Sequence, residues 1–217
     1  MDLFENNLFE NTDEQTLHIA EGATVLRRFA LTNEAQLLAD LNLLLSQSPP
    51  RRMVTPGGFN MSVAMTNCGK LGWVSDKKGY RYDALDPSTG EPWQAMPMSF
   101  MQLATQAAAV TGFANFVPDA CLINQYQPAT RMSLHQDKDE QDFTQPIVSV
   151  SLGCPATFLF GGLKRSDKPT KILLQHGDMV IWGGKSRLNY HGIMPLQANT
   201  HEAFGAYRYN LTFRKAA

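Results

Sequence analysis

The sequence predicts a mainly β fold with flanking helices. From Asp119 onward, short strand-like segments recur at regular spacing and are separated by turn residues, which is typical of a β-sandwich or jelly roll. Two stretches of the first half have the 3.6-residue apolar periodicity of amphipathic helices. The chain has 217 residues and 43% hydrophobic content, which is enough for a well-buried core.

The chain begins with an expected strand and a helix. Residues 23–31 (ATVLRRFAL) are β-prone and are expected to form a strand. A helix follows, because Thr32 and Asn33 are both good N-cap residues and the apolar periodicity continues up to Pro49 and Pro50. The proline pair is expected to end this helix.

The middle of the chain changes character. Residues 51–95 contain many glycines and prolines around short β-prone pieces, which indicates hairpins and loops that could form a flap. A second helix is expected over residues 96–112, with Pro97 in its first turn and Gly112 at its end. The strands expected after it cover residues 120–126, 146–153, 156–162, 171–184, 189–196 and 206–213.

These elements suggest three regions. Residues 1–16 form an acidic tail, residues 17–95 form an N-terminal extension with the flap, and residues 96–217 form the β-rich core. No apolar run approaches the roughly 20 residues that span a bilayer, and the acidic N-terminus lacks the basic start of a secretory signal. We therefore expect a cytoplasmic protein.

The cysteine spacing and the net charge limit the kinds of site that the chain can contain. Cys68, Cys121 and Cys154 are widely spaced and form no CxxC pair, which argues against a disulfide framework and a thiolate zinc site, so they are expected to be reduced and buried. The formal net charge of -1 means that any nucleic-acid role must depend on local patches. Residues 70–81 and 161–171 are such patches, although an ordinary solvated loop would have the same composition.

A candidate metal site begins in residues 134–140 (LHQDKDE). Charge clusters of this kind are commonly surface loops, but His135 and Asp137 would point to the same face of an extended chain. A third ligand is needed, and two histidines, His176 and His191, follow before the last stretch of the chain. His176 lies in a His-Gly-Asp sequence that reads as a turn, whereas His191 lies in a strand-like segment, so His191 is the predicted third ligand.

Two histidines and one carboxylate leave coordination positions open. This facial triad is typical of non-haem Fe(II) oxygenases, although a catalytic zinc ion can have the same ligands. In residues 207–214 (YRYNLTFR), the polar residues Arg208, Asn210, Thr212 and Arg214 alternate with aromatic and apolar residues, as in a strand with one polar face. As a plain amphipathic strand it would place both arginines in solvent; beside a facial triad they could bind the distal carboxylate of 2-oxoglutarate. Asn124 and Tyr126 could add neutral donors to the same ligand.

Several motifs together resemble the AlkB family of nucleic-acid dealkylases that depend on 2-oxoglutarate and Fe(II). The resemblance rests on HxD at residues 135–137, His191 and RYNLTFR at residues 208–214, and it extends from VLRRFA near the N-terminus through TPGG, MSVAMTNCG, LGW, PDACLIN and FGGLKR. It implies a double-stranded β-helix (jelly-roll) dioxygenase core over residues 96–217 and a nucleotide-recognition lid within residues 17–95.

The resemblance also implies roles for individual residues. The implied Fe(II) ligands are His135, Asp137 and His191. The implied 2-oxoglutarate residues are Asn124, Tyr126, Arg208, Asn210 and Arg214. The implied substrate residues are Thr55, Met65, Trp73, Tyr80, Lys138, Asp139 and Arg165.

Within the substrate set, Trp73 would stack on a flipped base opposite His135, and Asp139 would contact its exocyclic amine. Tyr80 and Thr55 would hold phosphates, and Arg165 and Lys138 would help to hold the strand. Without the resemblance, a core anchor is the alternative role for Trp73.

The implied reaction is oxidative demethylation of 1-methyladenine and 3-methylcytosine in DNA, preferably single-stranded, with RNA as a further candidate. The cofactors are Fe(II), 2-oxoglutarate and O2, and the products are formaldehyde, succinate and CO2. We expect a monomer that repairs DNA by direct reversal. The alternatives are a 2-oxoglutarate-dependent hydroxylase of a protein or small molecule, and a non-enzymatic metal-dependent nucleic-acid binder.

Two positions close in sequence to the predicted metal ligands have separate expectations. Asn189 stands where the family would lead us to expect an aromatic residue, so packing around the metal could differ. Glu140 has no assigned role and is expected to be a solvated charge.

Overall fold

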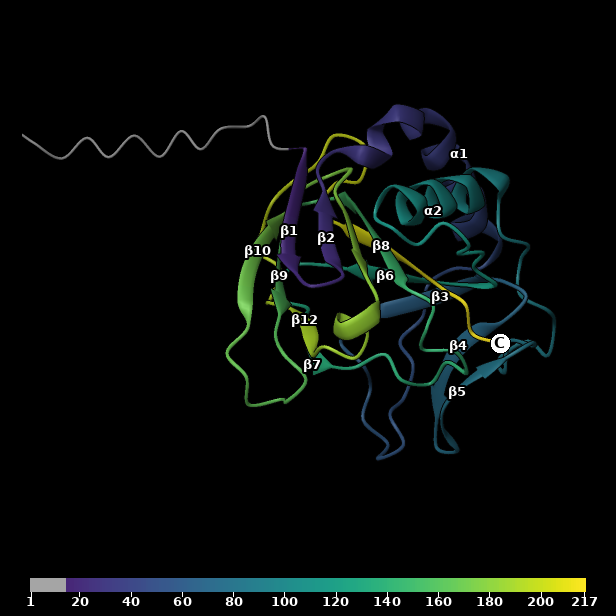
Figure 1. Ribbon diagram of the computed structural model, residues 1–217. Helices are drawn as coiled ribbons and strands as arrows, with labels where there is room; N and C mark the ends of the chain where they lie inside the picture. Colours follow the sequence, from purple (N-terminus) through teal and green to yellow (C-terminus); the bar gives the residue numbers. More distant parts are fainter. Residues whose placement is uncertain (1–14) are drawn as a thin grey trace, which may run out of the picture.

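The computed structural model describes residues 15–217, so the predicted tail lies outside the described residues except for Gln15 and Thr16. Within residues 15–217, the strands form a seven-stranded sheet, a four-stranded sheet and a two-stranded hairpin (Figure 1). Two α-helices cover one side of the larger sheet. The prediction of a mainly β fold with flanking helices is confirmed.

The larger sheet is antiparallel throughout and has the order β1-β2-β11-β8-β13-β6-β3. Its strands are β1 (Thr16–Ala20), β2 (Ala23–Leu26), β3 (Ala64–Gly69), β6 (Ala120–Tyr126), β8 (Ile147–Gly153), β11 (Met179–Trp182) and β13 (Arg208–Arg214). Strands from residues 17–95 and from residues 96–217 therefore complete one sheet.

The smaller sheet has the order β10-β9-β12-β7. Its strands are β7 (Met132–His135), β9 (Ala156–Phe160), β10 (Thr170–Leu174) and β12 (His191–Ile193). Buried side chains from both sheets form one hydrophobic cluster, in which Phe158 and Phe160 lie against Trp182 with ring centroids 6.2 and 6.3 Å apart. The two sheets are therefore packed face to face.

Both predicted helices are present. Helix α1 (Glu34–Gln47) has Asn33 at its N-cap position, although the Asn33 side chain makes no capping hydrogen bond, and it ends before the proline pair. Helix α2 (Met98–Val110) begins directly after Pro97. Beyond its end, Gly112 has a φ of 95°, a conformation that glycine adopts without steric cost.

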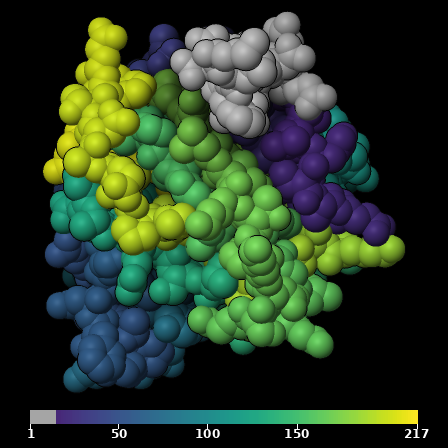
Figure 2. All heavy atoms as spheres, turned by 90° about the vertical axis from the view of Figure 1, so that its left-hand side faces the viewer, coloured from purple at the N-terminus to yellow at the C-terminus, as the bar shows by residue number. Residues whose placement is uncertain are grey.

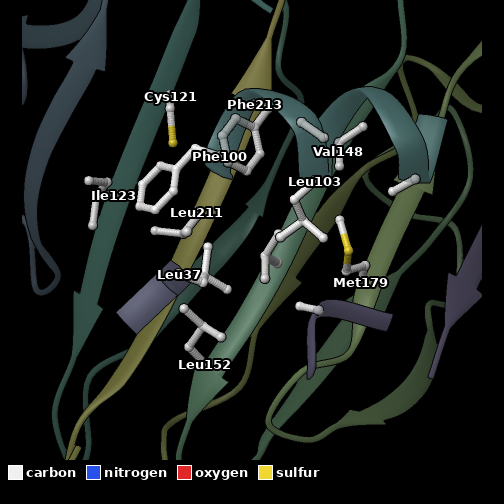
Figure 3. Packing of buried hydrophobic residues seen from close by; sticks show 14 of the residues in the cluster. Leu37, Phe100, Leu103, Cys121, Ile123, Val148, Leu152, Met179, Leu211 and Phe213 are labelled. Atoms are coloured by element: carbon white, nitrogen blue, oxygen red, sulfur yellow. The ribbon is translucent and has the colours of Figure 1, made fainter. Parts of the chain in front are cut away.

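The helices pack on the outer face of the larger sheet. In Figure 3, Leu37 of α1 and Phe100 and Leu103 of α2 lie over Leu211 and Phe213 of β13. Because successive side chains of a strand point to opposite faces, burying this apolar face under the helices directs the alternate residues of β13 toward the smaller sheet.

This packing decides where the polar face of β13 lies. All seven residues of the strand are buried, and Arg208 and Arg214 are only 1% and 5% exposed. The alternative of an amphipathic strand with its arginines in solvent is therefore wrong. The smaller sheet covers the polar face and leaves a pocket between the sheets.

The N-terminal strand differs from the sequence prediction. Residues 23–31 were expected to form one strand, but β2 ends at Leu26 and a 3-10 helix, η1 (Phe29–Asn33), follows. Asp178 accepts hydrogen bonds from the Arg27 side chain and the Arg28 backbone, and Arg28 has a positive φ of 56°. These contacts turn the chain toward α1. Strand β1, which pairs with β2, had no counterpart in the prediction.

The β4–β5 hairpin (β4, Gly72–Asp76; β5, Gly79–Asp83) stands outside both sheets, at the lower right of Figure 1. In Figure 2 the blue residues of this part of the chain gather at one corner of the molecule. A second 3-10 helix, η2 (Gly184–Ser186), lies between β11 and β12. Loops and hairpins were expected in residues 51–95, but β3 from this region belongs to the larger sheet.

The structure also describes the state of the cysteines and the character of the helices. Cys68, Cys121 and Cys154 are buried free thiols, as predicted. None of the helices within residues 15–217 has the length and apolar character needed to cross a bilayer.

Candidate metal and co-substrate site

The three predicted metal ligands lie together in the lining of the pocket. One ligand atom from each of His135, Asp137 and His191 lies within 4.8 Å of the others. The Nε2 atoms of His135 and His191 are 3.6 and 3.7 Å from different oxygens of the Asp137 carboxylate. Nitrogen and oxygen ligands at this spacing can surround one divalent ion, and they occupy one side of it.

Backbone contacts fix both imidazoles in the form that binds metal. His135 Nδ1 lies 2.9 Å from the Ser133 carbonyl, and His191 Nδ1 lies 3.0 Å from the Asn189 carbonyl. A carbonyl oxygen can only accept a hydrogen bond, so each Nδ1 carries the proton. The Nε2 lone pairs, which face Asp137, are therefore free to bind an ion.

Strand pairing brings the third ligand to the other two. His191 of β12 is the direct antiparallel partner of His135 of β7. The next residue, Gly192, is packed so tightly that an added Cβ would lie 2.7 Å from the Met132 carbonyl oxygen. A glycine at this position allows β12 to approach β7, so it helps to set the spacing between the two histidines.

The charges around the ligands favour metal binding. Burial alone would raise the pKa of Asp137, but the positive charge of Arg214, which donates from Nη2 at 2.6 Å and from Nε at 3.1 Å, holds that pKa well below its usual value. Burial and the nearby His135 lower the pKa of His191 to about 4. At neutral pH the site therefore presents a carboxylate and a neutral imidazole, which are the protonation states that a metal requires.

The pocket beside the metal ligands is lined by both sheets. Its polar lining contains the predicted co-substrate residues, while aromatic and aliphatic side chains close the rest. The lining residues are Leu122, Asn124, Tyr126, Met132, His135, Asp137, Ser149, Phe158, Trp182, His191, Gly192, Ile193, Arg208, Asn210, Thr212 and Arg214.

Arg208 is a buried cation without a counter-charge. Its Nη2 donates to the Ser151 hydroxyl at 3.0 Å, and its guanidinium lies 5.0 Å from the centre of the Tyr126 ring. Within residues 15–217, Nε and Nη1 have no hydrogen-bond partner, and no carboxylate forms a salt bridge with this residue. A buried charge left in this state is costly unless a ligand neutralises it. The pocket therefore fits a carboxylate such as the distal group of 2-oxoglutarate.

The two asparagines of the pocket differ in whether their side-chain amide atoms all have hydrogen-bond partners. The Asn210 amide is occupied, because Nδ2 donates to the Ser149 hydroxyl at 2.7 Å and Oδ1 accepts from Thr212. Asn124 donates to Asn210 at 3.3 Å, and its own Oδ1 has no partner among the described residues. Asn210 thus orients Asn124, and the free polar atom belongs to Asn124.

Three predicted substrate residues, Trp73, Tyr80 and Asp139, lie together. The Trp73 indole N–H donates to the Asp139 carboxylate at 2.8 Å. The Trp73 and Tyr80 rings are stacked, with centroids 5.6 Å apart and planes 13° apart. Trp73 is half-buried in the β4–β5 hairpin and packs against the inter-sheet cluster rather than within it.

The other predicted substrate residues are more scattered. Thr55 lies in a tight turn, where its hydroxyl accepts a hydrogen bond from the backbone N–H of Phe59. Lys138 is exposed, and Arg165 is exposed with its guanidinium 5.4 Å from the centre of the Tyr190 ring. Met65 is 1% exposed and does not line the pocket, so its contact with substrate stays a prediction.

The expectation for Glu140 is wrong. Its side chain is 2% exposed and accepts hydrogen bonds from Tyr82 at 2.6 Å and Arg187 at 2.9 Å. Local sequence gave no signal for this, because the partners lie 58 and 47 residues away. Trp182 is a second residue that sequence reasoning missed: its ring lies 4.8 Å from His191, and its Nε1 has no partner among the described residues.

Asn189 and His176 have structural roles. The Asn189 side chain lies 3.4 Å from the Ser186 hydroxyl and does not line the pocket. His176 contacts Glu34 at 2.8 Å and accepts from the Gly153 backbone, far along the sheet from the metal ligands. As predicted, His176 is not part of the metal cluster.

Comparisons with known proteins agree with this geometry. Residues 22–214 match the model of the 2OG-Fe(II) oxygenase superfamily. The chain is 61% identical to the alpha-ketoglutarate-dependent dioxygenase AlkB of Salmonella typhimurium over 92% of each protein. It is 57% identical to the protein of that name from Escherichia coli over 97% of each.

A solved structure is also similar. The structure of OsALKBH1 superposes with a TM-score of 0.79 at 28% identity, over 92% of this chain and 99% of that one. The fold, the His-Asp-His cluster and nearly full-length identity of this level all agree, and the chain therefore belongs to the AlkB family of the 2OG-Fe(II) oxygenase superfamily.

Proposed function

We propose that this protein removes methyl groups from damaged bases of DNA by Fe(II)- and 2-oxoglutarate-dependent oxidation. The observation that carries the proposal is one pocket that contains a facial His-Asp-His cluster and, deeper between the sheets, the uncompensated Arg208. Such a pocket fits a metal ion and an acidic co-substrate side by side. In this proposal the two sheets are a double-stranded β-helix.

The residues of the pocket have different roles in this reaction. His135, Asp137 and His191 would hold Fe(II), which couples the oxidation of 2-oxoglutarate by O2, to succinate and CO2, with hydroxylation of a substrate methyl group. Arg208 binds the distal carboxylate of the co-substrate, and Tyr126 and Asn124 supply neutral contacts beside it. Arg214 keeps Asp137 ionised. The hydroxymethylated base then releases formaldehyde, and its ring nitrogen is restored.

The hairpin suits a cationic base. In 1-methyladenine and 3-methylcytosine the methyl group blocks the pairing edge and fixes a positive charge on the ring. The face of Trp73 and the carboxylate of Asp139 both attract positive charge, and the two residues are joined by the indole N–H, which donates to the carboxylate at 2.8 Å. These two residues would therefore favour methylated bases over their neutral parents.

The substrate has to leave the base stack to reach the metal. A base that pairs poorly costs less to extrude, and a single strand costs least, so single-stranded DNA is the expected preferred substrate, with double-stranded DNA and RNA as further ones. Tyr80 and Thr55 would hold phosphates of the strand, Lys138 and Arg165 would help to hold the strand, and Met65 belongs to the same proposed substrate set. The lid in this proposal is formed by the loops and hairpin of residues 51–95.

We expect the enzyme to act as a monomer in the cytoplasm, and the free thiols of its three buried cysteines are compatible with a reducing compartment.

A mass-based assay tests the proposal directly. Protein loaded with Fe(II) is incubated with 2-oxoglutarate and a single-stranded oligonucleotide that contains one 1-methyladenine, and the mass of the oligonucleotide is followed. We expect the loss of one methylene mass with an equal amount of succinate. Succinate release that responds to a peptide but not to the methylated oligonucleotide would refute a nucleic-acid function, and DNA binding without any turnover would refute an enzymatic one.

A further inference from the structure

A buried ion pair joins the metal site to the hairpin. Arg187 Nη2 and Glu140 Oε2 are 2.9 Å apart, and their side chains are 3% and 2% exposed. Burying two charges adds little net stability compared with an apolar pair of the same volume. Stability alone therefore does not explain why a glutamate and an arginine occupy this position.

The remaining donors of Arg187 hold the loop that carries a metal ligand. Nη1 donates to the backbone carbonyl of Asp137 at 2.7 Å, and Nε donates to the backbone carbonyl of Gln145 at 3.0 Å. These carbonyls lie near the two ends of the loop between β7 and β8. One guanidinium thus spans the loop, and it lies four positions before His191 in the chain.

Glu140 extends the same network in two directions. It accepts a hydrogen bond from the Tyr82 hydroxyl at 2.6 Å, and its other contact is Arg214 Nε at 3.4 Å. Tyr82 is the antiparallel partner of Trp73 in the β4–β5 hairpin. Arg214 is the residue that also binds the Asp137 carboxylate. Glu140 therefore links Tyr82 of the hairpin to the two arginines that contact Asp137.

We propose that Glu140 and Arg187 are positioning residues that set the Asp137 ligand, and that Tyr82 fixes the nucleotide-contacting hairpin to the same pair. The hairpin's part in nucleic-acid binding rests on the proposed function, whereas the setting of Asp137 rests on contacts within the protein. Neither residue of the ion pair lines the pocket, so both act through Asp137.

Metal affinity is the first measurement. Co(II) serves as the probe, and its absorption spectrum and dissociation constant are recorded without turnover. Glu140→Gln keeps the shape of the side chain but leaves Arg187 without its counter-charge, and Arg187→Lys removes the fork that reaches both carbonyls. We expect each change to weaken Co(II) binding by about 10- to 100-fold, as outer partners of metal ligands typically do.

Asp178→Asn is the matched control. Asp178 is 1% exposed and binds Arg27 at 2.7 Å, so the change also neutralises a buried carboxylate that faces an arginine, but it lies in the turn between β10 and β11. We expect a lower melting temperature with unchanged Co(II) affinity. Equal loss of Co(II) affinity in this variant would show a general effect of destabilisation and would overturn the proposal.

Tyr82→Phe separates the two halves of the network. Because Glu140 and Arg187 stay paired in this variant, we expect Co(II) affinity within threefold of wild type and about tenfold weaker binding of a methylated oligonucleotide, measured by fluorescence anisotropy. Unchanged oligonucleotide binding would overturn the role of Tyr82.

The two variants of the ion pair test the positioning role independently, so one of them is enough if the other does not fold. Folded Glu140→Gln protein, as judged by circular dichroism, that binds Co(II) with wild-type affinity would overturn the positioning role; if it does not fold, Arg187→Lys decides the question by the same measurement. A wild-type protein that binds Co(II) but no methylated oligonucleotide would refute the proposed function and leave the metal comparison valid.

Discussion

His191 lies directly opposite His135 on neighbouring antiparallel strands, and their ring centroids are 4.4 Å apart. The two histidines are 56 residues apart in the sequence, so strand pairing, rather than chain proximity, creates the site. Their spacing depends on how closely β12 approaches β7.

Gly192→Ala tests this dependence. The new Cβ would meet the Met132 carbonyl oxygen at 2.7 Å, so β12 and β7 have to separate by several tenths of an ångström. We expect Co(II) affinity to fall at least tenfold, because metal ligands tolerate little displacement. Gly57→Ala is the control, since its added Cβ would have ordinary contacts of 3.5 Å with Phe59. Wild-type Co(II) affinity in Gly192→Ala would contradict the expectation.

Replacing the two pocket arginines should have opposite effects on stability. Arg208→Met removes a buried charge that has no counter-ion, so we expect the metal-free protein to unfold at equal or higher urea concentration while 2-oxoglutarate affinity falls at least 100-fold. Arg214→Met leaves the Asp137 and Glu140 carboxylates without a shared partner and should cost about 3–5 kcal/mol. Urea unfolding and 2-oxoglutarate titration measure both effects. A comparable loss of stability in the two variants would show that Arg208 has a partner after all.

The metal-free protein should lose stability in mild acid. The folded state keeps His191 neutral until about pH 4, whereas the unfolded chain takes up this proton near pH 6.5. The stabilisation is therefore complete above pH 6.5, and it is lost as the pH falls toward 4. The loss amounts to about 3 kcal/mol for a shift of this size.

His191→Gln isolates this contribution. Urea unfolding of chelator-treated protein is measured at several values between pH 7 and pH 4, and the wild type should show the steeper decline. Parallel curves for the two proteins would mean that His191 titrates normally in the folded state.

Asp139→Asn should affect substrate choice rather than the co-substrate. Asparagine can still accept the Trp73 hydrogen bond, but the negative charge beside the base is lost. We expect kcat/KM for a 1-methyladenine oligonucleotide to fall about 10- to 100-fold, with an unchanged KM for 2-oxoglutarate. Asp142→Asn, on the same loop, should leave both constants unchanged. A higher KM for 2-oxoglutarate in Asp139→Asn would show that Asp139 acts on the co-substrate rather than on the base.

Much of the fold followed from local patterns. Apolar periodicity with capping residues and prolines predicted α1 and α2, and turn residues separated the strands of the C-terminal half. The break after Leu26 did not follow, because it depends on Asp178, which is about 150 residues away. The membership of β3 in the larger sheet was likewise missed, since pairing with β6 is a long-range property.

By itself, the sequence determined the two periodicities that matter most: the i, i+2 spacing that puts His135 and Asp137 on one side of the chain, and the alternation that puts Arg208 and Arg214 on one face of β13. Tertiary structure alone decided that this face is covered by a second sheet, that Arg208 stays without a counter-ion while Arg214 has two, and that Glu140 is buried. The physical reason is that period and spacing fix the direction of a side chain relative to its own strand. Burial and charge pairing depend on which distant strand or loop lies opposite.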